Sequence, residues 1–133
     1  YALLLVDIDH FKRINDAHGH GVGDQALVGV ARTLRTAMRP GDVVARTGGE
    51  EFCVLLADMD PAQALRTAQR LREAVRDDLL VVGDLRLPLT CSIGVAWTRE
   101  ASDGLEAMSR RADEAMYRAK ALGRDRVVAA SGL

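Results

Sequence analysis

The sequence lacks an excess of either charge. Its 18 lysine and arginine residues are balanced by 19 aspartate and glutamate residues, which gives a formal net charge of −1. A surface without a positive field has little to hold the phosphate backbone of DNA or RNA. A nucleic-acid polymer is therefore a disfavoured partner.

Cysteines and long apolar runs are also scarce. Cys53 and Cys91 both lie in apolar runs (EFCVLL and LTCSIGVA), where a thiol behaves as a small buried hydrophobic group. We therefore expect no disulfide framework, as in a reducing cytoplasm. The apolar stretch at residues 2–6 is much shorter than the roughly 20 residues that cross a bilayer. We expect no signal peptide and no membrane contact from this segment.

The composition that is present is that of an ordinary globular domain, with 48% apolar and 28% charged residues. A chain of 133 residues can bury roughly two thirds of its unfolded surface without metal or disulfide staples. We found no internal repeat, low-complexity tract or linker in it. The sequence predicts one domain over residues 1–133.

Hydrophobic periodicity predicts alternating strands and helices. The aliphatic run at residues 2–8 is typical of a central strand covered on both faces, and carboxylates close it at Asp7 and Asp9. Helical spacing predicts three long helices with caps at Asp24, at Asp60 before Pro61, and at Gly123. Their ranges are 27–38, 60–77 and 105–122, with inward stripes of Leu27, Val30, Ala31, Leu34 and Met38; Leu65, Ala68, Leu71 and Val75; and Leu105, Met108, Ala112, Ala115, Met116 and Ala119.

Further strands are predicted at about 42–47, 51–57 and 87–97, with a hairpin turn at Gly83 and Asp84 and a last short strand at Val127 and Val128. The order βαββαβ predicts a ferredoxin-like α/β (α+β) sandwich, with a mostly antiparallel central sheet flanked by helices.

Residues 9–23, with the sequence DHFKRINDAHGHGVG, are expected to form a long polar loop. Loops of this length inside compact domains are usually functional. Lys12 and backbone amides suit a polyphosphate, while Asp7 at the strand end suits Mg²⁺. No role is indicated for His18, which we interpret as a solvated residue.

A second acidic cluster lies at the turn formed by Gly48, Gly49, Glu50 and Glu51. The glycines allow a positive φ and a close approach of a ligand to the backbone. If the strands that carry Asp7 and Glu50 are neighbours, the two carboxylates suffice for a magnesium site. Carboxylates on turns are about as often simply solvated, so the residues alone leave both interpretations open.

Several motifs in order over nearly the whole chain resemble the GGDEF family of diguanylate cyclases. The turn RTGGEEF resembles the signature loop of that family in its GGEEF form. The other matching segments are DIDHFKRIND at 7–16 (DxDxFKxxND), HGVGD at 20–24 (HxxGD), SIGVA at 92–96, and ADEAMYRAKALGRDRV at 112–127 (AxxAMYxAKxxGRNxV). The resemblance implies the palm-like fold of nucleotidyl cyclases and polymerases.

The resemblance also implies site residues. Asp7, the carbonyl of Ile8 and Glu50 would bind two Mg²⁺ or Mn²⁺ ions per active half-site, and Glu50, Glu51 and Lys12 would act in catalysis. The substrate contacts would be Phe11, Lys12, Asn15, His20, Asp24, Gly48, Gly49, Lys120 and Arg124. Asn15 and Asp24 would read guanine, because an adenine would leave a buried carboxylate unpaired. Lys120 and Arg124 also suit the end of a helix for purely electrostatic reasons.

The implied reaction joins two GTP molecules into cyclic di-GMP and two pyrophosphates across a transient head-to-head homodimer. Arg39 and Asp42 form an RxxD at the position of the family's inhibitory product site, and Arg70 would supply another arginine. An isolated RxxD is more often a surface ion pair. The expected setting is the bacterial cytoplasm, with an upstream sensory or receiver domain, in some cases within a membrane-anchored sensor.

The sequence departs from the family pattern in two places. It begins at Tyr1, directly before the first strand, without the preceding DxLTGLxNR segment, so we expect an N-terminally truncated domain. Asp125 replaces the usual asparagine after GR. One alternative is a catalytically silent receptor for GTP or cyclic di-GMP, which the intact Glu50 and Glu51 disfavour. Another is a cyclase that accepts ATP, which Asp24 disfavours.

Overall fold

The structure is a computed structural model that describes residues 1–100 and 104–131. In chain order its elements are β1 (Ala2–Ile8), α1 (Phe11–His18), α2 (His20–Thr36), β2 (Val43–Gly48), β3 (Glu51–Leu56), α3 (Pro61–Asp77), β4 (Leu80–Val82), β5 (Leu85–Leu87), β6 (Cys91–Trp97), α4 (Leu105–Ala121) and β7 (Arg126–Ala129).

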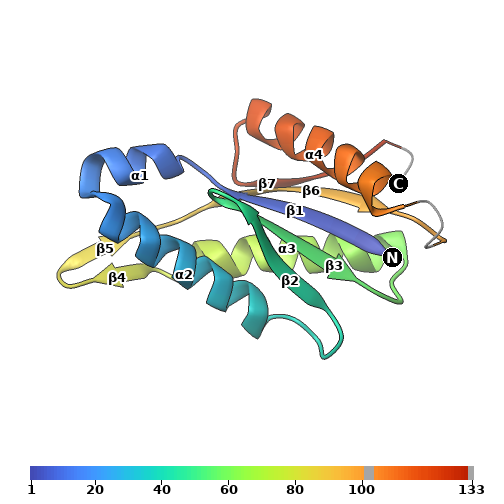
Figure 1. Cartoon of the computed structure of the whole chain (residues 1–133), viewed down its shortest axis with the longest axis horizontal. Coiled ribbons are helices and arrows are strands. Elements are labelled where there is room, and N and C mark those ends of the chain that lie inside the picture. Colours follow the sequence, from blue (N-terminus) through green and yellow to red (C-terminus); the bar gives the residue numbers. More distant parts are fainter. Residues whose placement is uncertain (101–103, 132–133) are drawn as a thin grey trace.

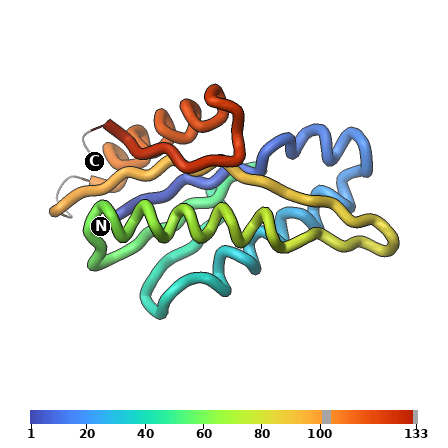
Figure 2. Tube along the Cα trace, turned by 180° about the vertical axis from the view of Figure 1, so that it is seen from behind, coloured from blue at the N-terminus to red at the C-terminus, as the bar shows by residue number. Residues whose placement is uncertain are grey.

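The main sheet has five strands in the order β2-β3-β1-β6-β7, with helices on both faces (Figure 1). Neighbouring strands are antiparallel except β6 and β7, which run parallel. The view from behind shows α3 lying across one face, with α4 on the other (Figure 2). This arrangement confirms the predicted fold class.

The central strand β1 separates two hydrophobic cores. Its alternation directs Leu4 and Val6 into the larger core with α2 and α3, and Leu3 into the smaller core with α4. Asp7 has the same parity as Leu3, so its carboxylate emerges on the face that α4 covers. The fold therefore places this acidic side chain beneath the end of α4.

Helix α4 packs unusually close to β6 because Gly94 has no side chain. A Cβ on Gly94 would overlap the carbonyl oxygen of Ala112 and the amide nitrogen of Met116, and would lie 3.0 Å from the Cα of Met116. These atoms belong to the helix backbone and cannot rotate away. The close approach positions the last turn of α4, with Lys120, over the end of β1.

The predicted loop at residues 9–23 is wrong, since this segment forms α1 and the first turn of α2. α2 starts at His20 with Gly19 at its N-cap, so Asp24 lies inside the helix and is not its cap. Only Ile14 of α1 is buried. α1 has only eight residues, most of them polar, and a periodic segment this short is hard to distinguish from a polar connection in the sequence.

The observed ends of α3, β6 and α4 differ less from the predicted ones. α3 has the predicted Asp60 cap and Pro61, extended to a capping box by Gln63. The predicted strand at 87–97 is shorter, because β6 begins at Cys91 and Leu85–Leu87 pairs instead with β4 around Gly83. Leu105 does not point inward as predicted: its side chain is 58% exposed, and the buried stripe of α4 begins at Met108.

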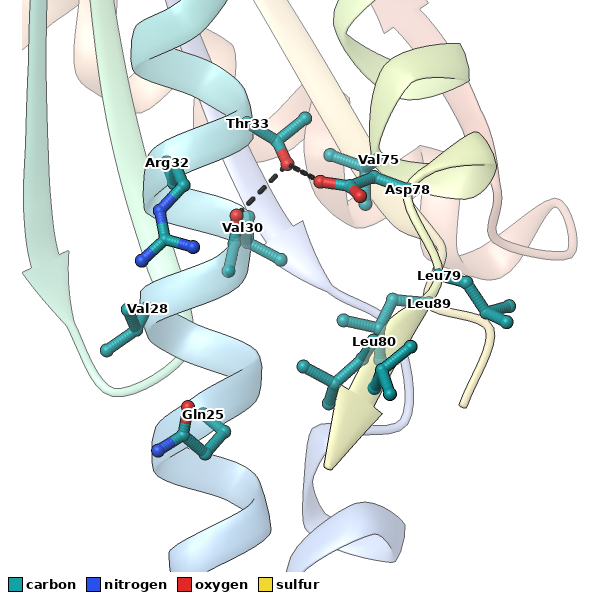
Figure 3. Close-up of a pocket in the computed structure, with 12 residues that line it drawn as sticks. Gln25, Val28, Val30, Arg32, Thr33, Val75, Asp78, Leu79, Leu80 and Leu89 are labelled. Atoms are coloured by element: carbon teal, nitrogen blue, oxygen red, sulfur yellow. Dashed lines mark hydrogen bonds between the residues drawn. The ribbon is translucent and has the colours of Figure 1, made fainter. Parts of the chain in front are cut away.

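The β4–β5 hairpin packs beside α2, and a cavity of about 170 Å³ lies between them (Figure 3). Its lining combines apolar side chains such as Val30 and Leu89 with polar ones such as Arg32. The Thr33 hydroxyl lies 2.6 Å from an Asp78 carboxylate oxygen and so joins α2 to the residue after α3. None of the predicted site residues lines this cavity.

Among the residues described, no helix is both long enough and apolar enough to span a membrane. Cys53 is half-buried and Cys91 is buried, and both thiols are free. Burial raises the pKa of both thiols above the ordinary cysteine value, which makes them poor nucleophiles.

Candidate functional site

A polar cavity of about 310 Å³ lies where β1 ends. Segments distant in the sequence meet there: the end of β1, the start of α1, the β2–β3 turn and the last turn of α4. Its lining residues are Asp7, Ile8, Asp9, His10, Phe11, Lys12, Arg13, Glu50, Lys120 and Arg124. Acidic and basic side chains therefore line the same cavity.

The sheet brings the two predicted metal-binding carboxylates together. Asp7 lies opposite Glu51 in the β1–β3 register, and the amide of Ile8 donates to the carbonyl of Glu50 at 3.2 Å. Asp7 and Glu50 both line the cavity, whereas Glu51 does not. The condition stated from the sequence, that these strands be neighbours, is therefore met.

The acidic turn itself is held in a defined shape. Gly49 has a φ of 42°, and the Arg46 side chain donates to its carbonyl oxygen at 2.9 Å. A register shift between Arg46 and Gly48 marks a β-bulge just before the turn. Gly48 and Gly49 therefore shape the tip of the hairpin but do not line the cavity.

Lys120 forms an ion pair with Asp7, at 2.8 Å between Nζ and Oδ2. The Asp7 side chain is only 6% exposed in this pair. Burial raises the pKa of Asp7 from 3.8 to about 6; Lys120 opposes this rise, while Glu50 and Glu51 add to it. A nearby positive charge therefore stabilises the ionised Asp7 carboxylate, and Lys120 supplies that charge in the free chain.

Cationic side chains line the remaining wall. Lys12, Lys120 and Arg124, the predicted phosphate contacts, lie there, and Arg13 joins them from α1. His10, also on the wall, has a left-handed backbone with φ 56°, a conformation that non-glycine residues adopt at an energetic cost. Strain of this kind is commonly found at functional sites.

Of the other predicted substrate contacts, those expected to read guanine lie outside the cavity. Phe11 lines it, but Asn15, His20 and Asp24 do not. Asn15 lies against Gly23, where a Cβ would overlap its Oδ1 and lie 2.9 Å from its Cγ. His20 and Asp24 are exposed on the first turns of α2.

The donor set at the carboxylate end fits a magnesium or manganese ion in chemistry, although it is not a complete cage. Within residues 1–100 and 104–131, no group of three or more His, Cys, Asp or Glu side chains converges to hold a metal. Mg²⁺ commonly takes one or two carboxylates and completes its shell with water and substrate phosphates. Asp7, Glu50 and the Ile8 carbonyl match that partial set.

Comparison with known proteins assigns the chain to a family. The family model described as "Diguanylate cyclase, GGDEF domain" matches residues 1–126. The chain belongs to the GGDEF family.

Relatives of this GGDEF domain include the diguanylate cyclase DgcM of Escherichia coli, 47% identical over 131 residues, which are 98% of this chain and 31% of DgcM. The chain spans between 18% and 34% of the length of such curated relatives.

Solved structures of GGDEF domains have the same fold as this chain. The GGDEF domain of YfiN from Pseudomonas aeruginosa is 39% identical with a TM-score of 0.92, covering 98% of this chain and 81% of that one. The GGDEF domain of DgcB from Caulobacter crescentus, crystallised with c-di-GMP, is 34% identical with a TM-score of 0.89, covering 96% of this chain and 76% of that one.

The predicted product-site residues of the GGDEF domain lie away from the polar cavity. Arg39 and Arg70 line a separate hollow of about 480 Å³ beside α3, and Arg66, which we did not predict, lies on the same wall. Arg66 is one helical turn before Arg70, so the i, i+4 spacing of arginines on α3 was a signal that could have indicated it.

Asp42 of this GGDEF domain does not face that hollow in the structure. The Arg39 guanidinium contacts both Asp42 carboxylate oxygens at 3.3 Å and donates to the carbonyl of Ala57 at 2.9 Å. The Asp42 side chain is left 4% exposed. In this conformation Arg39, whose side chain is 51% exposed, and Asp42 form an ion pair at the surface, as the alternative interpretation of the sequence held.

Proposed function

We propose that this GGDEF domain is a diguanylate cyclase, which condenses two GTP molecules into cyclic di-GMP and two pyrophosphates. The observation that carries the proposal is the cavity at the end of β1, where Asp7 and Glu50 share a wall with Lys12, Lys120 and Arg124. Carboxylates suit a divalent metal and the cations suit a triphosphate, so the combination favours a metal–nucleotide substrate. The names of the relatives support the same reaction.

Asp7, Glu50 and the carbonyl of Ile8 would hold two Mg²⁺ or Mn²⁺ ions in each half-site. Glu51 lies opposite Asp7 in the β1–β3 register and does not line the cavity. When bound, such ions would polarise the phosphates and lower the pKa of the attacking hydroxyl. The raised pKa of Asp7 supports this assignment, because it reflects a buried negative charge that a divalent cation would neutralise. That neutralisation would also release Lys120 from Asp7 toward a phosphate.

In each half-reaction, the 3′-oxygen of one GTP attacks the α-phosphorus of the other. The O3′–phosphorus bond forms as the bond to the bridging oxygen breaks, and pyrophosphate leaves with that electron pair. Glu50 would accept the proton of the 3′-hydroxyl, with Glu51 beside it. Lys12, Lys120 and Arg124 would stabilise the negative charge that develops on the phosphates.

Specificity for guanine would come from Asn15 and Asp24, with His20, Phe11 and the turn residues Gly48 and Gly49 as further contacts. An aspartate accepts hydrogen bonds from the N1 and N2 donors of guanine, which adenine lacks. The close packing of Asn15 on Gly23 supports a fixed orientation of its amide. The product contains two phosphodiester bonds between two nucleotides, so two chains would face each other as a transient homodimer.

Feedback inhibition would act through the hollow beside α3. Arg39 and Arg70 supply guanidinium groups that suit phosphates and guanine edges, and Arg66 adds a third. Cyclic di-GMP would displace Arg39 from Asp42 and so expose a carboxylate for guanine. This step would allow the same residues to form an ion pair in the free chain and a ligand site when the product binds.

We also infer a bacterial cytoplasmic setting, with a sensory or receiver domain upstream or a membrane-anchored sensor around it. The relatives support this, since each is about three times the length of the chain. Residues 1–133 would be the catalytic domain of such a protein.

Product identification tests the proposal. The whole protein is incubated with Mg²⁺ and either GTP or ATP, and the products are identified by mass, with Glu50→Gln as the control. We expect cyclic di-GMP from GTP alone and no product from the control. Binding of GTP without turnover would indicate a receptor, and a cyclic product from ATP would indicate a different cyclase.

A further inference from the structure

Asp9 follows Asp7 by two residues, which suggests a second metal ligand, but its oxygens are used elsewhere. The residue is 5% exposed. Its Oδ1 accepts from the Ser92 hydroxyl at 2.6 Å, and its Oδ2 accepts from the Thr90 hydroxyl at 2.8 Å and from the Asp125 amide at 2.9 Å. A carboxylate with these partners ties β1 to the start of β6 and to the turn after α4.

That turn is strained and carries a cavity residue. Arg124 and Asp125 are consecutive non-glycine residues with φ values of 64° and 45°. Such left-handed residues persist only where the surroundings hold them. Arg124 lines the cavity, so whatever fixes the turn also fixes where the Arg124 guanidinium can reach.

Arg72 of α3 holds the same turn from the opposite side. Its Nη1 lies 2.7 Å from Oδ1 of Asp125 and 3.4 Å from the Asp125 carbonyl oxygen. The Arg72 side chain is only 10% exposed. A buried guanidinium needs a charged partner, and the other contacts of Arg72, with Gln69 at 3.5 Å and Glu73 at 3.9 Å, are longer.

This pairing explains the departure of Asp125 from the family motif. Asparagine tolerates a left-handed backbone as well as aspartate does, so the turn alone does not require the acid. An asparagine, however, would leave the Arg72 charge without a close counter-ion. The acid at 125 therefore matches the buried arginine at 72.

We propose that Arg72 and Asp9 are positioning residues, which clamp the Arg124–Asp125 turn from two sides and so hold Arg124 on the nucleotide cavity. The inference rests on the proposed function only in naming the ligand of Arg124 as a GTP phosphate. Arg72 does not line the cavity, and the Asp9 carboxylate, which does, is already bonded to Ser92, Thr90 and the Asp125 amide. Arg72 acts through Asp125, and Asp9 acts through the Asp125 amide.

The test compares Arg72→Met, Asp125→Asn and Arg124→Ala, singly and combined, in the whole protein. We expect Arg72→Met and Asp125→Asn each to lower kcat/KM for GTP about tenfold, since a misplacement of one ångström can cost about 100-fold and the remaining contacts of the turn should limit the displacement. The double variant Arg72→Met/Asp125→Asn should lose no more than the worse single variant. Arg76→Met, one turn along α3 with its side chain 45% exposed, is the matched control and should match the wild type.

Epistasis with Arg124 separates positioning from general loss of structure. In the Arg124→Ala background, Arg72→Met should change kcat/KM no further, because the residue it positions is gone. A further tenfold loss in that background, or wild-type kcat/KM in both Arg72→Met and Asp125→Asn, would overturn the proposal. If Arg72→Met does not fold, Asp125→Asn alone decides, because it keeps the shape of the side chain.

Equilibrium binding of a non-hydrolysable GTP analogue keeps the two proposals distinguishable. A wild-type protein that binds the analogue but makes no cyclic di-GMP refutes the proposed cyclase only. The positioning role then predicts about tenfold weaker analogue binding in Asp125→Asn and in Arg72→Met than in Arg76→Met. Equal binding in all three variants would overturn the positioning role whether or not the wild type is active.

Discussion

At the scale of single residues, Asp7 shows a conflict between burial and charge. Its folded pKa of about 6 exceeds the ordinary value of 3.8, so between these values the folded chain binds a proton that the unfolded chain releases. The ionised carboxylate therefore destabilises the metal-free fold above pH 6, and this penalty disappears as the pH falls below about 4. The buried, ionised Asp7 thus lowers the stability of the metal-free protein and at the same time attracts a cation to the site.

We expect Asp7→Asn to raise the free energy of unfolding of the metal-free protein at pH 7.5 by about 3 kcal/mol, the equivalent of the shift in the pKa of Asp7 from 3.8 to about 6. The gain should shrink as the pH falls from 6 to 4, because the wild-type carboxyl is then protonated as well. Urea unfolding in a chelating buffer at several pH values measures it. A variant that is less stable than the wild type at pH 7.5 would show that the Lys120 ion pair outweighs the burial of Asp7.

Gly23 has no side chain, and the Asn15 amide occupies the space that a Cβ would take. Because a Cβ there would overlap Oδ1 of Asn15, Gly23→Ala should displace the Asn15 amide and weaken the reading of guanine. We expect kcat/KM for GTP to fall about 10- to 100-fold, with little change in the unfolding temperature. Gly21→Ala is the control, since nothing lies within 4 Å of its Cβ position. Equal activity of the two variants would rule out this role.

At the scale of elements, the contact of α4 with β6 at Gly94 determines how the last turn of α4 meets β1. Gly94→Ala should destabilise the fold by about 2–3 kcal/mol, because the added carbon meets helix backbone that cannot move aside. Gly29→Ala in α2 meets only Leu80 Cδ1 at 3.7 Å and should be neutral or stabilising. Denaturant unfolding compares the two, and equal stabilities would contradict the close packing.

The sequence correctly predicted those elements whose capping residues and apolar pattern all lie within the element itself. Asp60, Pro61 and the apolar stripe of α3 define that helix without tertiary information, and the aliphatic run of β1 defines a buried strand. It failed for α1, an eight-residue helix of mostly polar residues that ends at Gly19 and buries only Ile14. It also misplaced Leu105, because periodicity cannot show where the partner surface of α4 ends.

At the scale of the whole molecule, the polar cavity and the hollow beside α3 are separate, so catalysis and inhibition should be separable. We expect cyclic di-GMP added to Arg39→Ala to inhibit it at least about tenfold less than the wild type, because the variant lacks a guanidinium for the dinucleotide. Arg76→Ala, outside the hollow, should keep wild-type inhibition. Inhibition curves for pyrophosphate release measure this. An unchanged curve for Arg39→Ala would reject the product site.

Only part of the candidate site could be predicted from the sequence. The motif resemblance indicated Asp7, Glu50 and Lys120, and the sheet register explains why the two carboxylates meet. The Lys120–Asp7 ion pair joins residues 113 positions apart, and the Arg72–Asp125 pair joins residues 53 apart. No local pattern encodes such contacts, because they depend on how α3 and α4 pack across the sheet.

The central claim is that Asp7 and Glu50 jointly hold a divalent metal with the nucleotide. Titration of the protein with Mn²⁺ in the presence of a non-hydrolysable GTP analogue, with free Mn²⁺ followed by electron paramagnetic resonance, tests it directly. We predict at least about tenfold weaker Mn²⁺ binding in Asp7→Asn and in Glu50→Gln, but not in Asp16→Asn, an exposed carboxylate on α1. Wild-type affinity in both of the first two variants would contradict the account.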